Sequence, residues 1–167
     1  MDLQEIIDES KLLGEWAHIA TVSPSGIPYV TPVHPCWEGQ TLWSMVGTDS
    51  AKAKNIGSSP LVSCHWQVSP ETNFDSLIIW GRAALHADIE TKQRLWEGVF
   101  DYDLNEFAPG GPTESVGTGF MAIIPTKALA PIQPIWQREL IDQKQNNFQF
   151  PNPKLGQNGT SDQRTMA

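Results

Sequence analysis

The sequence predicts a mainly β protein, a six- to seven-stranded antiparallel split β-barrel with peripheral helices. Short apolar runs recur between turn signals along most of the 167 residues. Thirteen glycines and thirteen prolines indicate many turns, which disfavours a helix bundle. Only three stretches have the composition or periodicity of a helix, and the length suits one domain with its own core.

The N-terminal residues 2–13 are expected to form an amphipathic helix. Apolar residues at helical spacing share one face: Leu3, Ile6, Ile7 and Leu13. Asp2 and Glu5 have the spacing of a capping box, and Gly14 follows as a stop signal. This helix is therefore bounded at both ends by its own sequence.

Two predicted strands, residues 16–23 and 28–34, flank the turn signal of residues 24–26 and form a hairpin. Pro32 lacks a backbone N–H, so it is expected at a sheet edge or a bulge. A third strand is predicted over residues 41–47. The first half of the barrel thus consists of a hairpin and one further strand.

The composition changes to helix formers at Ser50, and residues 57–60 end the predicted helix. Strands are predicted over residues 61–68 and 76–87, with Gly81 marking a bulge or bend in the second. This part of the chain therefore alternates a short helix with two further barrel strands.

A second amphipathic helix is predicted over residues 89–100, with Asp88 as its N-cap. Residues 102–116 are expected to be irregular because they carry a Pro-Gly-Gly-Pro run. The last strands are predicted over residues 117–124 and 132–140. They complete the barrel.

Residues 1–142 are expected to form a single domain, followed by a polar tail over residues 143–167. The composition of the tail is typical of disorder, and if the tail is ordered we expect it to pack on a dimer partner. No internal repeat or linker divides the rest of the chain.

The net charge of −8 and the pI of about 4.8 disfavour nucleic-acid binding and docking on anionic membranes. No apolar run approaches the roughly 20 residues that span a bilayer, and the N-terminus lacks the pattern of a signal peptide. Two cysteines, Cys36 and Cys64, suit a reducing compartment. The expected location is the cytoplasm.

The strongest candidate for a binding motif is Gly47-Thr48-Asp49-Ser50-Ala51-Lys52-Ala53-Lys54, where a strand ends and a helix begins. A helix N-terminus offers free N–H groups to an anion. Thr48 and Ser50 add hydroxyl donors, and Lys52 adds a charge, so the ligand predicted here is a phosphate. The alternative makes Asp49 or Ser50 an ordinary N-cap and leaves the lysines on a solvated helix face.

Four residues, His34, Cys36, Cys64 and His65, are of the types that bind zinc. Their H-x-C and C-H spacings do not match known fingers, and adjacent strand residues point to opposite sides of a sheet. The sequence therefore predicts no metal site. Neither cysteine lies in a pattern that marks a nucleophile with its base and oxyanion hole.

No nucleophile elbow, dinucleotide fingerprint, metalloprotease motif or carboxylate pair occurs. No catalytic residue is therefore assigned, and the chemistry of an enzyme with this sequence would belong to a cofactor. Most of the seven tryptophans are expected in the core or at an interface. Trp136 is the exception, because a late strand can reach a partner's site.

The order of these motifs resembles that of the pyridoxamine 5′-phosphate oxidase-like, FMN-binding split-barrel proteins. Five segments carry the resemblance: ATVSPSGIPYVTPV (20–33), TLWSMVGTDSAKAKNI (41–56), the strand over residues 60–67, LIIWGRAALHADIETKQRLW (77–96) and GFMAIIPTKA (119–128). The first two are the most specific, because a hairpin with a proline-bearing second strand precedes a strand-TxSxK-helix step.

The resemblance implies a homodimer with FMN in a groove between subunits, a small-molecule substrate and an oxidoreductase that transfers hydride to or from flavin N5. By position it assigns the ring wall to Val30, Thr31, Pro32 and Val33. It assigns the phosphate to Thr48, Ser50 and Lys52, with Lys54 as a second charge. It places Trp66 and Gln67 against the flavin from the other side or from the other chain, and Trp136 as a contribution from the partner.

The sequence also departs from the family pattern. Arg138 is the only arginine near the C-terminal strand, whereas vitamin B6 oxidases use several for two phosphates, so this substrate is disfavoured. Deazaflavin, FAD and haem stay open as alternative cofactors, and His34, His65 and His86 are the histidines available to a haem. A flavin- or haem-binding stress or sensor protein without turnover is the alternative function, beside a deazaflavin-dependent reductase.

Overall fold

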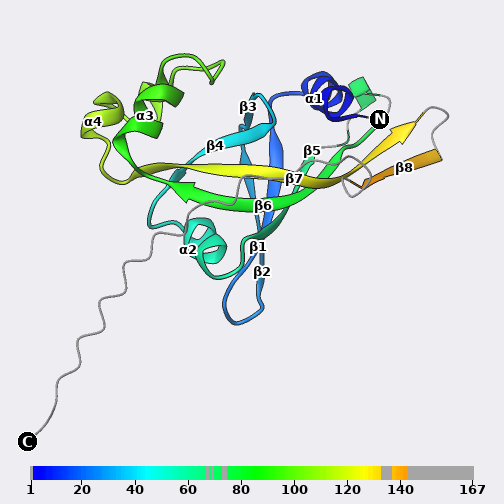
Figure 1. The fold of residues 1–167 in the computed structure, drawn as a ribbon, viewed down its shortest axis with the longest axis horizontal. Helices are drawn as coiled ribbons and strands as arrows, with labels where there is room; N and C mark the ends of the chain where they lie inside the picture. Colours follow the sequence, from blue (N-terminus) through cyan, green and yellow to red (C-terminus); the bar gives the residue numbers. More distant parts are fainter. Residues whose placement is uncertain (1, 67, 69, 73–74, 133–136, 143–167) are drawn as a thin grey trace, which may run out of the picture.

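The computed structural model describes residues 2–66, 68, 70–72, 75–132 and 137–142. The described strands form one antiparallel sheet in the order β2-β1-β5-β6-β7-β4-β3, with β8 paired to β7. This mainly β architecture confirms the predicted fold class. Figure 1 shows the long strands β6 and β7 side by side, the hairpin β1–β2 projecting from the sheet, and the helices at its periphery.

The strands are β1 (Ala17–Val22), β2 (Pro28–Val33), β3 (Cys36–Glu38), β4 (Thr41–Gly47), β5 (Leu61–Trp66), β6 (Ile78–His86), β7 (Thr118–Ile132) and β8 (Gln137–Asp142). The α-helices are α1 (Leu3–Leu12), α2 (Ala51–Ser58), α3 (Ile89–Trp96) and α4 (Gly111–Glu114). Two short 3-10 helices, Pro70–Thr72 and Leu104–Glu106, lie in connections.

The predicted helix starts are confirmed by their hydrogen bonds. The amide of Glu5 donates to the carboxylate of Asp2 at 2.9 Å, and the amide of Asp2 donates to the carboxylate of Glu5 at 2.6 Å, which completes the capping box. Ser50 and Asp88 are the N-caps of α2 and α3, and each side chain accepts one hydrogen bond from the amide three residues on. Local sequence therefore positions all three of these helices.

The two outermost strands in the sheet order, β2 and β3, follow one another directly in the chain. Only His34 and Pro35 separate them in the chain. Pro32 lies in the edge strand β2, as predicted, opposite His18 of β1. The split between the barrel's edges is thus bridged by a two-residue link, and His34 stands in it.

The structure corrects three strand predictions. β3 was not predicted, because three residues are too few for a periodic signal. β7 continues eight residues beyond the predicted end at 124, to Ile132, and β8 begins at Gln137 and not at 132. Pro125, just past the predicted end, pairs with Gly81 where the register shifts, and a bulge tolerates a residue without an N–H.

The main core lies inside the sheet, between its curved face and α1 and α2. It contains fully buried side chains of β1, β4, β5, β6 and β7: Ile19, Leu42, Trp66, Ile79, Met121 and Ile123. A second cluster joins α3 to β4 and β7 through Trp43, Leu95, Leu104, Phe120 and Ala122. In the described part of the chain, no helix is long and apolar enough to span a membrane.

Candidate functional site: a cavity at the split edge of the barrel

A cavity of about 140 Å³ lies where β2 ends, between α2 and the segment that follows α3. Its lining is apolar and aromatic apart from one lysine and one histidine. The lining residues are Trp16, Pro32, Val33, His34, Met45, Lys52, Tyr102 and Phe107. An apolar cavity with few polar groups is the usual form of a cofactor or substrate site.

Strand β2 supplies one wall of the cavity, but only its last two residues line it. Side chains alternate along the strand, so Thr31 and Val33 face the core while Val30 and Pro32 face outward. Val30 is 65% exposed. The hydroxyl oxygen of Thr31 is buried without a hydrogen-bond partner among the described residues, which leaves a polar group available beside the wall.

Lys52, in the first turn of α2, supplies the positive charge of the cavity. Burial lowers the pKa of Lys52 below its ordinary value of 10.5, and among the described residues no carboxylate pairs with it. A half-buried ammonium without a counter-charge is costly and therefore attracts an anion. Lys54, two residues on, is exposed to solvent and does not line the cavity.

The start of α2 adds donors beside Lys52. The Ser50 hydroxyl accepts a hydrogen bond from the amide of Ala53 at 3.3 Å, so Ser50 is an N-cap. The amides of Ala51 and Lys52 have no partner in the described structure, as is usual in a first turn. The hydroxyl of Thr48 donates to the carbonyl of Gly117 at 3.2 Å, which fixes the strand end next to the helix.

A row of rings forms the opposite wall. The imidazole of His34 stacks on Tyr102 with centroids 4.2 Å apart and lies 5.4 Å from the ring of Trp16. Phe107 meets Tyr102 edge-on at 5.6 Å. Burial raises the pKa of the Tyr102 hydroxyl, which stays protonated and lies 3.4 Å from the carbonyl of His34. This wall can stack against a flat aromatic ligand.

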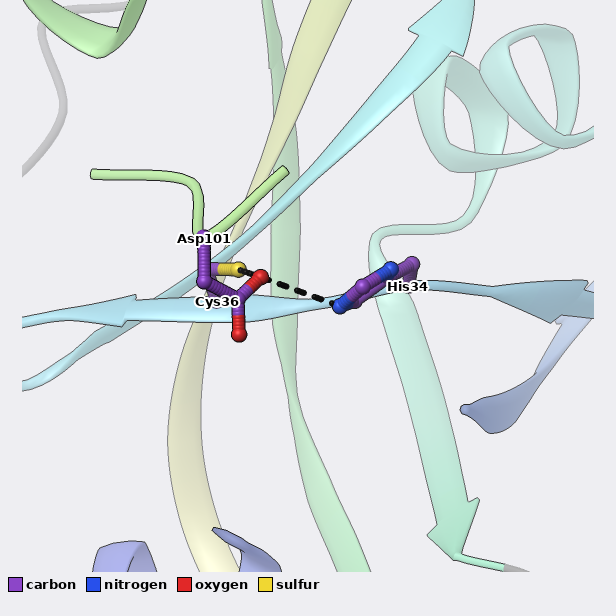
Figure 2. A group of neighbouring side chains, drawn as sticks. All are labelled: His34, Cys36 and Asp101. Atoms are coloured by element: carbon purple, nitrogen blue, oxygen red, sulfur yellow. Dashed lines mark hydrogen bonds and ion pairs between the residues drawn. The ribbon is translucent and has the colours of Figure 1, made fainter. Parts of the chain in front are cut away.

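His34 also faces a small polar cluster behind this wall. Figure 2 shows the His34 imidazole, the Cys36 thiol and the Asp101 carboxylate converging on one another. The thiol donates to Oδ1 of Asp101 at 3.3 Å, and Nε2 of His34 lies 3.1 Å from the same oxygen. Burial raises the pKa of Cys36 to about 12, so the free thiol is protonated at neutral pH and is a poor nucleophile.

The other predicted site residues lie elsewhere. The side chain of Trp66 is 2% exposed and packs in the main core, in the same sheet row as Val33, because both pair with Ala17. Gln67 and Trp136 lie outside the described residues. The structure therefore brings Pro32, Val33 and Lys52 to one cavity and leaves Val30 and Lys54 on the surface.

Five lining residues were missed from sequence: Trp16, His34, Met45, Tyr102 and Phe107. The signal that was available is the aromatic content of the irregular segment after α3. No local pattern linked that segment to β2, from which it is separated by about 70 residues of chain. Only the fold brings these residues together.

The sequence matches a known protein family over the segment that forms the cavity. Residues 6–113, more than half of the chain, match the family model of pyridoxamine 5′-phosphate oxidase. The chain belongs to the pyridoxamine 5′-phosphate oxidase family. The matched segment contains β1 to β6, α2 and the aromatic segment after α3, and so includes every lining residue of the cavity. No curated protein matches the sequence.

Solved structures share the fold of this family member at low sequence identity. A protein from Clostridium acetobutylicum, related to general stress protein 26 and of the pyridoxinephosphate oxidase family, superposes with a TM-score of 0.70 at 12% identity, covering 87% of this chain and 99% of its own. General stress protein 26 of Bacillus anthracis gives 0.63 at 19%, covering 85% and 99%. A heme binding protein of Mycobacterium smegmatis gives 0.67 at 11%, covering 86% and 59%.

Proposed function

We propose that this pyridoxamine 5′-phosphate oxidase-family protein binds FMN in the cavity at the split edge and acts as a flavin-dependent oxidoreductase on a small molecule. The observation that carries the proposal is Lys52, a half-buried cation without a counter-charge among the described residues, at one end of an apolar cavity. FMN joins a flat aromatic ring to a dianionic phosphate, so it requires an apolar wall for the ring and a positive charge for the phosphate, and the two ends of the site provide these.

The phosphate end would be held by the start of α2. Lys52 supplies the charge, and the free amides of the first turn supply donors. The hydroxyls of Thr48 and Ser50 stand at the same step between strand and helix, each already fixed by a hydrogen bond to the backbone. Lys54 is exposed, so its contribution would be a weak, screened attraction.

The ring would lie along the end of β2. Pro32 and Val33 line the cavity, while Val30 and Thr31 extend the wall toward the hairpin turn. Pro32 has no N–H, so donors to the ring's polar edge must come from its neighbours or from the Thr31 hydroxyl, which is buried without a partner in the described chain. Trp66, packed in the row of Val33, would support this wall from the core.

A second copy of the chain would complete the site. Cofactor pockets commonly measure about 300–1,000 Å³, so a cavity of about 140 Å³ in one protomer would hold only part of the flavin. The outer face of the hairpin exposes Val22, Pro28 and Val30 along an unpaired sheet edge. Apolar area of this kind is typical of an interface. Gln67 and Trp136 are proposed to reach the ligand from the partner or from its edge.

When bound, FMN would supply hydride transfer at its N5 atom. The residues of the chain would bind and orient it, and the aromatic wall would exclude water from the reacting face. No lining side chain is an evident general acid or base, because the raised pKa makes the Tyr102 hydroxyl a weak proton donor and Nε2 of His34 is turned toward Asp101. Substrate protons would therefore be exchanged by the substrate itself or by water.

Haem is the second candidate ligand, since His34 lines the cavity and a haem-binding protein shares this fold. The test is the spectrum of the purified chain and its titration with FMN, a deazaflavin and haemin. Tight FMN binding, with bleaching by NADH or NADPH and reoxidation by an added acceptor, supports the oxidoreductase. FMN binding without turnover supports a sensor, and a chain that binds no FMN overturns the proposal.

A further inference from the structure

The cluster formed by His34, Cys36 and Asp101 combines three kinds of metal ligand at one point. His34 and Cys36 lie in and just after the link between β2 and β3, and Asp101 comes from the segment that follows α3. Among the described residues it is the single group in which three such ligand atoms lie within 4.8 Å of one another. Figure 2 shows the three side chains together, and of the three only His34 also lines the cavity, whereas Cys36 and Asp101 do not.

Two of the three spacings between the ligand atoms already fit a tetrahedral site. With zinc bonds of about 2.3 Å to sulfur and about 2.0 Å to nitrogen and oxygen, tetrahedral ligands lie roughly 3.3–3.5 Å apart. Here Sγ of Cys36 lies 3.3 Å and Nε2 of His34 lies 3.1 Å from Oδ1 of Asp101. The remaining spacing, from Sγ of Cys36 to the His34 nitrogen, is at most 4.8 Å, and around a bound zinc ion it would be about 3.5 Å.

The environment of the histidine nitrogen supports the same assignment. Nε2 of His34 is shielded from solvent and makes no hydrogen bond within the described structure, although it lies within ion-pair distance of Asp101. A buried polar atom without a partner is costly and is rare in folded proteins. A metal ion at the centre of the cluster would satisfy it.

We propose that Nε2 of His34, Sγ of Cys36 and a carboxylate oxygen of Asp101 bind a zinc-type divalent cation. Thiolate, imidazole and carboxylate are the ligands that zinc uses, and three protein ligands leave a fourth position for water. On binding, the thiol proton of Cys36 passes to solvent as the S–H bond is replaced by the S–metal bond, and no oxidation or reduction occurs.

The surroundings give the ion a route and a structural effect. The Asp101 side chain is 66% exposed while that of His34 is 13% exposed, so the cation enters from the side of Asp101. Binding ties the segment after α3 to the link between β2 and β3. The same segment carries Tyr102, which lines the cavity, so the metal fixes one wall of the ligand site.

The test uses the full chain, freed of metal with a chelator and titrated with Zn²⁺ by calorimetry and with Co²⁺ by absorption. We expect one ion per chain, with a thiolate-to-cobalt charge-transfer band and the visible bands of a four-coordinate ion. Asp101→Asn and His34→Gln should each weaken binding by at least about 10–100-fold, a loss typical even of outer-shell partners. Cys36→Ser should remove the charge-transfer band.

Two control variants leave the three proposed metal ligands unchanged and replace another residue of the same type. Asp103→Asn changes a carboxylate on the same segment that caps a 3-10 turn, and Cys64→Ala changes the buried thiol of β5. Both should bind both metals as the unaltered chain does. Because Asp101 is exposed, Asp101→Asn should stay folded even if Cys36→Ser does not. Absence of the charge-transfer band, or unchanged affinity in Asp101→Asn, overturns the proposal.

Discussion

Replacing Lys52 with methionine tests the proposed phosphate site most directly. The substitution keeps the apolar stem that lines the cavity and removes the charge. A hydrogen bond to a charged group contributes about 1.5–3 kcal/mol. Lys52 is half-buried and, among the described residues, has no competing carboxylate, so screening is weak. We therefore expect Lys52→Met to weaken FMN binding by about 10–150-fold.

The positive charge of Lys52 should destabilise the folded state of the FMN-free chain. Burial lowers the pKa of Lys52, which means that the charged form is less favourable in the folded chain than in the unfolded one. Lys52→Met should therefore leave the unfolding free energy of the FMN-free chain unchanged or raise it. A loss of FMN affinity without a loss of stability distinguishes a ligand contact from a packing contact.

The assay is the quenching of flavin fluorescence on titration, paired with thermal unfolding of the FMN-free chain. Lys54→Met is the matched control, since it removes an exposed lysine from the same helix and should change the dissociation constant less than threefold or so. Equal affinity of Lys52→Met and the unaltered chain would refute the assignment. A similar loss in both variants would instead indicate a diffuse electrostatic attraction.

Three further substitutions test the fold and its assembly. Gly81→Ala would place a Cβ atom 2.5 Å from the carbonyl oxygen of Ile124, so chemical denaturation should show a loss of about 1–3 kcal/mol, whereas Gly57→Ala, with open space around it, should be neutral or stabilising. Burial and the neighbouring His18 lower the pKa of His65 below 6.5, so protonation of His65 destabilises the folded chain and the unfolding free energy falls as the pH drops below 6.5. His65→Gln should reduce this acid sensitivity. An unchanged dependence of the unfolding free energy on pH would contradict the role given to His65. Val30→Asp, on the exposed hairpin face, should give a monomer in sedimentation and weaken FMN binding, and a dimer that survives it would place the interface elsewhere.

Local sequence determined the elements whose ends are marked by capping or turn residues. The capping box of Asp2 and Glu5 and the N-cap Asp88 were predicted because their spacing is short and their chemistry is specific, whereas Ser50 was one of two N-cap candidates, with Asp49, in the alternative to a phosphate site. Strand Thr41–Gly47 was predicted to the residue. Long-range pairing overrode the local signals elsewhere, as at Pro125.

Part of the candidate site was predicted from the sequence. Pro32, Val33 and Lys52 were predicted from one segment and one family resemblance, and the structure brings them to one cavity. Their chemistry depends on burial, which sequence does not state: Lys54 has the same side chain as Lys52 and is exposed. Helix periodicity separates them, because residues two apart point to different sides of a helix.

By itself, the sequence determined the mainly β class, most of the strands along the chain and the family, because these depend on alternation, turn residues and short motifs. The tertiary structure decided which side chains meet. The Asp101 carboxylate reaches His34 and Cys36 across more than sixty residues of chain, and the rings of Tyr102 and Phe107 close the cavity from the same segment. No local pattern encodes such contacts, since they arise only when the sheet register brings the end of β2 beside the segment that follows α3.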